Sequence, residues 1–135
     1  TSRPIHFLSL KNIVTCDLAP VPQPMEWVRG AGLPMWIGHL EGWLSIVKHR
    51  VEPGMLLVRA RDADHIAHLW VHAYVEYTPE ADYPYRAVIS ADEVADVVAD
   101  QLVNIGYDNF KAHVTEPRLR RAFSQIWVTM LRWFN

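Results

Sequence analysis

The chain has 135 residues, half of them hydrophobic, and a formal net charge of −2 at pH 7. This length predicts a single domain with one core. The near-neutral net charge gives no electrostatic footprint for bulk nucleic-acid or membrane-surface binding, although a local basic patch is compatible with it. No apolar run approaches the roughly 20 residues of a bilayer span, so we predict no membrane association. Cys16 is the only cysteine, which fits a reducing compartment, and we expect a cytoplasmic location.

The first part of the chain differs in composition from the rest. Pro20, Pro22 and Pro24 alternate in "LAPVPQP", and proline lacks an N–H and favours extended geometry, so this stretch resembles a polyproline connector. We interpret residues 1–40 as a Pro- and Trp-containing N-terminal arm, and residues 41–135 as a single α+β domain.

From Trp43 onward, alternating apolar residues and turn signals follow one another regularly. Four strands are predicted, over residues 43–50, 55–61, 71–77 and 85–90. Pro53 and Gly54 suit a turn between the first two strands. Asp62 is a predicted cap for a short helix over residues 63–70.

Two longer helices follow the strands. Ser90 and Glu93 match a capping box at the start of the first, and Gly106 is predicted to end it as a left-handed cap. Pro117 suits the first turn of the last helix. Its predicted buried stripe consists of Leu119, Ala122, Phe123, Ile126, Trp127, Met130, Leu131 and Phe134.

The resulting order, β-β-α-β-β-α-α, predicts an α+β fold: a four-stranded, mainly antiparallel sheet with helices packed on one face. A ferredoxin-like arrangement of the strands is one topology that this order allows.

The strand "MLLVRAR" carries arginines within an apolar run. Strand alternation predicts that Val58 and Ala60 face the helices while Arg59 and Arg61 face outward. Arginine can hold a carboxylate or a phosphate with two parallel hydrogen bonds, and open sheets with arginine and aromatic groups bind single-stranded nucleic acid. An ordinary solvated face is the simpler alternative. The candidate ligand or partner surface, with two loop residues included, comprises His49, Arg59, Arg61, Tyr74, Tyr83, Arg86 and Lys111.

Histidines in "DHIAHLWVH" raise the alternative of a metal site. His65 and His68 would share one helix face, and His72 would join them if the helix continued. The spacing matches no established zinc motif, so ordinary surface histidines are the favoured interpretation. The sequence shows no nucleophile elbow, no Ser-His-Asp order and no phosphate-binding glycine loop, so we predict no catalytic residue and no cofactor.

Three phrases in the sequence resemble a known pattern: "VKHRVEPGMLLVRAR", "TPEADYPYRA" and "YDNFK". They are similar to phrases in a group of short, uncharacterised proteins from bacteria and their phages, and the resemblance extends from about Trp43 to Trp133. It implies a prokaryotic or phage cytoplasmic origin and transfers no catalytic residue.

The leading functional hypothesis is a small, non-enzymatic protein-binding or regulatory protein, such as a phage-encoded inhibitor, acting on a protein partner or as a homodimer. The six tryptophans favour it, because tryptophan is enriched at interface hot spots. The alternative is binding of nucleic acid or a phosphorylated ligand on the arginine-bearing sheet face. A metal-dependent hydrolase using His65, His68 and His72 is the second alternative.

Overall fold

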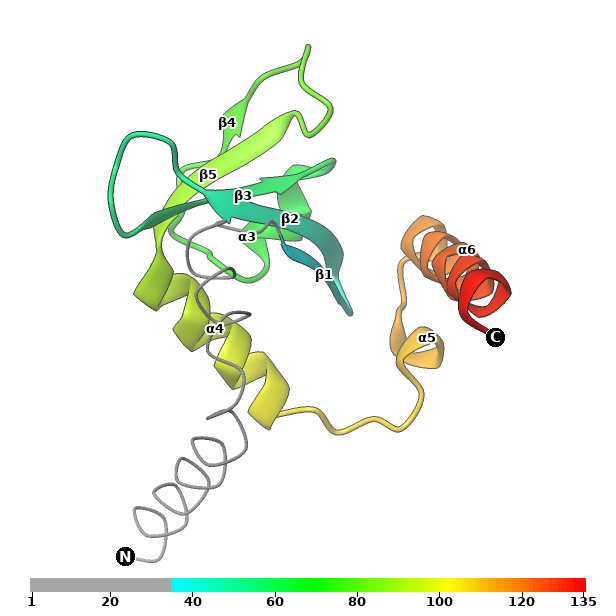
Figure 1. The fold of residues 1–135 in the computed structure, drawn as a ribbon. Helices are drawn as coiled ribbons and strands as arrows, with labels where there is room; N and C mark the ends of the chain where they lie inside the picture. Colours follow the sequence, from blue (N-terminus) through cyan, green and yellow to red (C-terminus); the bar gives the residue numbers. More distant parts are fainter. Residues whose placement is uncertain (1–34) are drawn as a thin grey trace, which may run out of the picture. The chain divides into compact units, whose positions relative to one another are not determined.

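The computed structural model describes residues 35–135 (Figure 1). Most of the predicted arm, including Cys16 and the alternating prolines, lies outside these residues. The described strands are β1 (Met35–His39), β2 (Gly42–Lys48), β3 (Met55–Ala60), β4 (Glu76–Tyr77) and β5 (Tyr85–Ser90). The described helices are α3 (Ala63–Ala67), α4 (Ala91–Val103), α5 (Phe110–His113) and α6 (Pro117–Phe134).

The strands form one open sheet in the order β1-β2-β3-β5-β4, and every neighbouring pair is antiparallel. The predicted α+β class and the antiparallel sheet are therefore confirmed. The sheet has five strands where four were predicted, because β1 forms from residues assigned to the arm. The ferredoxin-like alternative is wrong, since that topology places parallel strands side by side through β-α-β units.

The predicted strand over 71–77 shrinks to two residues, and the helix before it is shorter than predicted. Trp70 follows α3 and lies in the core with 3% of its surface exposed. The Ala73 N–H donates to the Trp70 carbonyl over 3.1 Å, which closes a turn directly after this anchor. The strand consequently begins only at Glu76.

Local signals in the sequence place several element ends. Gly54 has φ +73°, as the predicted turn requires. The Asp62 carboxylate caps α3 by accepting from Asp64 N–H at 3.0 Å, and the Ser90 hydroxyl caps α4 by accepting from Glu93 N–H at 3.2 Å. The turn and both caps are confirmed, although only the Ser90 half of the predicted capping box is present among residues 35–135.

The predicted end of α4 is wrong. The helix stops at Val103, and Gly106 does not adopt a positive φ. Asn104 is the C-cap instead: its backbone N–H and its side-chain amide both donate to the Asp100 carbonyl, at 3.2 and 2.8 Å.

The main core lies between one sheet face and the helices α3 and α4. Alternate residues of β2, β3 and β5 point into it, and each buried Leu, Ile or Val among them contributes about 1.5–3 kcal/mol of hydrophobic stabilisation. The buried members are Leu44, Ile46, Val58, Ala60, Ile66, Trp70, Ala87, Ile89 and Val94.

Helix α6 packs elsewhere. Leu119 and Phe123 form a second cluster with Val114, to which Trp43 also belongs. Trp43 precedes Leu44, so it points to the sheet face opposite the main core. The prediction that all helices pack on one face therefore holds for α3 and α4 and is wrong for α6. Within residues 35–135, no helix is long and apolar enough to cross a membrane.

Candidate functional site

A row of side chains crosses the sheet on the face away from α3 and α4, one from each strand. The strand register places them directly opposite one another: Trp36, Ser45, Arg59, Arg86 and Glu76. We call the surface formed by Arg59, Arg61, Arg86 and Tyr83 the arginine face. Four of the predicted site residues thus belong to one surface.

Tyr83 is the centre of the arginine face. The Cζ atoms of Arg59 and Arg61 lie 5.0 and 4.9 Å from its ring centroid, within cation–π range. Arg86 Nε donates to the Tyr83 carbonyl at 3.1 Å, and its Nη2 lies 3.9 Å from the carboxylate of Asp82. A buried loop tyrosine therefore gathers Arg59 of β3, Arg86 of β5 and Arg61, which directly follows β3.

Arg59 is held in a fixed orientation. Its Nη2 donates to the hydroxyl of the buried Ser45 at 2.7 Å, while its Nε is buried and has no hydrogen-bond partner among residues 35–135. Within the same residues, neither Arg59 nor Arg61 has a carboxylate within salt-bridge distance. Arg86, by contrast, forms an ion pair with Asp82.

Two hollows lie in this face of the sheet. One, of about 530 Å³, is lined by Trp36, Ser45, Arg59, Asp82 and Tyr83. The other, of about 360 Å³, is lined by His49, Leu57, Tyr74, Glu76, Thr78, Arg86 and Val88. The structure therefore brings the predicted residues His49, Tyr74 and Arg86 to one hollow, and Arg59 and Tyr83 to its neighbour.

Two predicted residues have other contacts. Lys111 belongs to α5, where its Nζ lies 4.7 Å from the ring of Trp127, away from the arginine face. His49 accepts the N–H groups of Val51 and Glu52 at 3.3 and 3.0 Å through Nδ1, so it also fixes the β2–β3 turn.

The histidines considered as metal ligands do not form a ligand set. His65 Nδ1 accepts the Trp43 N–H at 3.3 Å. His68 lies at the C-cap of α3, and His72 is exposed beyond the helix. In the described part of the chain, no three His, Cys, Asp or Glu side chains converge on a possible metal position.

One histidine that the sequence did not single out is buried. His39 ends β1, with its Nε2 3.3 Å from the His65 carbonyl, and it accepts the Glu41 N–H at 3.3 Å through Nδ1. Burial lowers the pKa of His39 from 6.5 to about 4. Because His39 lies within residues 1–40, which we interpreted as an arm, its burial was not predicted.

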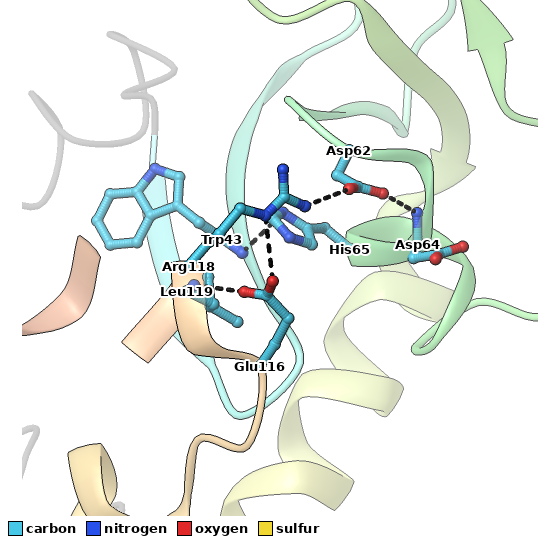
Figure 2. A network of polar contacts seen from close by, with 7 residues as sticks. All are labelled: Trp43, Asp62, Asp64, His65, Glu116, Arg118 and Leu119. Carbon is cyan, nitrogen blue, oxygen red and sulfur yellow. Dashed lines mark hydrogen bonds and ion pairs between the residues drawn. The ribbon is translucent and has the colours of Figure 1, made fainter. Parts of the chain in front are cut away.

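Polar contacts join α3 to α6 (Figure 2). Arg118 lies 3.8 Å from the Asp62 carboxylate and 3.1 Å from that of Glu116. The Glu116 carboxylate caps α6 by accepting the Leu119 N–H, and this hydrogen bond lowers the pKa of Glu116. Arg118 is largely exposed, so these ion pairs orient the start of α6 and stabilise it only weakly.

The second surface is the C-terminal half of α6. Leu119 and Phe123 are buried, with 7% and 5% of their surface exposed, whereas Trp133 and Phe134 are 75% and 81% exposed. The prediction that the whole stripe is buried is therefore wrong. We call the exposed group the α6 apolar face; it consists of Ile126, Trp127, Met130, Leu131, Trp133 and Phe134.

Comparison with models of protein families, with curated proteins and with solved structures finds no match for this chain. The resemblance to short bacterial and phage proteins stays a prediction. The arginine face and the α6 apolar face are the two surfaces from which a function can be inferred.

Proposed function

We propose that this chain is a non-enzymatic protein-binding module that holds an acidic, partly apolar segment of a partner protein on the α6 apolar face. The supporting observation is the exposure of six large apolar side chains along one side of α6; Val128, which is also exposed, lies on the other side. Contiguous apolar patches on soluble domains mark interaction sites, and tryptophan is among the residues most enriched at binding hot spots. A small inhibitor or regulator would act in this way, by blocking the other contacts of that segment.

The α6 apolar face continues the stripe that anchors the helix. Phe123, Trp127, Met130 and Phe134 follow at helical spacing, so they lie on one side of α6. Leu40, Trp43, Val114 and Phe110 cover its first half only. Because the anchored half holds the helix in place, a partner binding the second half loses little free energy to ordering α6.

The charges of α6 select the kind of partner. The helix carries four arginines and no acidic residue. Arg120 donates to the Val114 carbonyl at 2.8 Å and Arg118 pairs with Glu116, whereas Arg121 and Arg132 form no ion pair among residues 35–135. Both lie on the side of α6 away from the Phe123–Phe134 stripe, so they do not face a partner bound on it. Four arginines without an acidic residue still give the helix a positive field, and such a field speeds encounter with an acidic partner.

A photo-crosslinking amino acid placed at position 133 tests the proposal, with the polar-face position 125 as the control site. We expect position 133 to capture another protein through an acidic, apolar segment, and position 125 not to. With that protein purified, Trp133→Ala should cost about 2 kcal/mol or more in binding, roughly a thirtyfold weaker Kd. Val128→Ala, a truncation off the stripe, should leave the Kd within about twofold.

Other occupants give different results and contradict the proposal. A crosslink to residues 1–34 of the same chain would show that the arm occupies the face. A dimer in light scattering that Trp133→Ala dissociates would assign it to a second copy. Sedimentation with phosphatidylserine vesicles, without capture of any protein, would assign it to a membrane surface, which basic amphipathic helices also bind.

A further inference from the structure

We propose that the hollow beside the arginine face is a nucleotide site, in which Arg59 and Arg61 hold a phosphate and Trp36 stacks on the base. This site lies on the sheet and involves no residue of the α6 apolar face. Its ligand is therefore independent of the partner proposed for α6.

The two arginines supply a pre-oriented anion site. Ser45 fixes Arg59 through the 2.7 Å hydrogen bond, and the Tyr83 ring supports both guanidinium groups. Arginine held in this way loses little side-chain entropy on binding and can offer parallel donors to phosphate oxygens. Neither group is neutralised by a carboxylate in residues 35–135, and the buried Arg59 Nε still lacks an acceptor there.

Trp36 supplies a planar surface in the same hollow. Its indole is 67% exposed and is tilted against Trp43, with ring centroids 5.8 Å apart. Trp36 is opposite Ser45 and Ser45 is opposite Arg59, so the backbones of Trp36 and Arg59 are two strand spacings apart, roughly 10 Å. The Arg59 guanidinium reaches back toward Trp36 as far as Ser45. A nucleotide lying across β2 can therefore reach both, stacking its base as open-sheet nucleic-acid binders do.

The charge and size of the hollow agree with this ligand. Asp82 is the acidic residue in its lining, and the neighbouring Arg86 at 3.9 Å offsets that charge. Arg59 in the lining then leaves a local positive excess, and Arg61, which lines the adjacent hollow, reaches the Tyr83 ring at the edge of this one. The volume of about 530 Å³ lies within the range of small-molecule sites, roughly 300–1,000 Å³.

Isothermal titration of the full chain at low salt tests the site with three probes: adenosine 5′-monophosphate, inorganic phosphate and adenosine. We expect the nucleotide to bind more tightly than either fragment. Arg61→Ala should weaken nucleotide binding roughly tenfold or more, because it removes charge-assisted hydrogen bonds. Trp36→Ala should weaken it roughly fivefold or more and leave binding of inorganic phosphate unchanged.

Two further variants show whether the effect depends on the position of the charge and on its orientation. Arg121→Ala removes a similar charge from α6 and should leave nucleotide binding unchanged. Ser45→Ala keeps the Arg59 charge but removes the hydrogen bond that orients it. We expect it to leave the circular dichroism unaltered and to weaken nucleotide binding by less than Arg61→Ala does. Each variant is compared only after its unfolding midpoint has been measured.

A single-stranded oligonucleotide of about six residues distinguishes the two sources of the ligand. Tighter binding than the mononucleotide, with a steep dependence on salt, assigns the site to nucleic acid; equal binding assigns it to a free nucleotide. The proposal is overturned if neither the mononucleotide nor the oligonucleotide binds at concentrations up to about 10 mM. It is equally overturned if the nucleotide binds no more tightly than phosphate, or if Trp36→Ala has no effect on it.

Discussion

Gly42 occupies the point where β1, β2 and α3 come closest together. A Cβ atom at this position would lie 2.7 Å from the His65 Cβ, and 2.8 Å from both the His65 Cα and the His39 Nε2. Gly42 does not have a positive φ, so backbone conformation does not require glycine here. Close approach requires it, and two of the three obstructing atoms belong to the start of α3.

We predict that Gly42→Ala lowers the free energy of unfolding by about 1–3 kcal/mol, because the added methyl group must displace α3 or the His39 ring. Urea unfolding measures this. Gly106→Ala is the control: a Cβ there meets nothing within 4 Å, so its unfolding free energy should stay the same or rise by up to about 1 kcal/mol. Equal losses in the two variants would show that the close approach at Gly42 carries no energetic cost.

At the scale of elements, α6 is divided along its length. Its first half is part of the second hydrophobic cluster, where the ring of Phe123 lies 6.1 Å from Trp43 and 5.0 Å from Phe110. Gly38 makes this docking possible, because a Cβ there would lie 3.0 Å from the Phe123 ring. The second half continues the same stripe into solvent.

Two phenylalanines of α6 therefore differ in their contribution to stability. We predict that Phe123→Ala lowers the unfolding free energy by about 3–5 kcal/mol, since it empties a packed position. Phe134→Ala should change it by less than about 0.5 kcal/mol, because that ring is 81% exposed. Urea denaturation compares the two variants. A large destabilisation by Phe134→Ala would mean that the end of α6 is covered within the folded chain.

The elements also show what could be read from the sequence and why the rest could not. Alternation in β3 correctly predicted that Val58 and Ala60 are buried, because a strand with one apolar face can adopt only one register. The pattern in α6 predicted which side is apolar and overestimated how much of it is covered, since coverage depends on residues distant in sequence. Trp36 was assigned to the arm, because nothing local indicates that β1 pairs with β2.

For the molecule as a whole, His39 makes stability depend on pH. Burial keeps its imidazole neutral in the folded state, with a pKa of about 4 against 6.5 for an ordinary histidine. Between about pH 4 and pH 6.5, the unfolded chain therefore binds a proton at His39 and the folded chain does not. The contribution of His39 is complete above about pH 6.5 and is lost progressively as the pH falls toward 4.

We predict a loss of up to about 3 kcal/mol in unfolding free energy over that interval, from a difference of about 2.5 pKa units. Urea midpoints measured from pH 7 to 5 follow it before carboxylates such as Glu116, whose pKa is lowered, begin to contribute. His39→Gln should flatten this dependence, and His72→Gln, at an exposed position, should not. An unchanged slope in His39→Gln would assign the acid sensitivity to other groups.

The order of the sheet has a consequence for how the chain folds. Because β1, β2 and β3 are joined by short turns and pair with their immediate neighbours, three of the five strands can assemble by closing small loops. Only β5 must return over a longer stretch to reach β3. Such local pairing favours rapid folding, so the sheet surface around Trp43 can form before α6 packs against it.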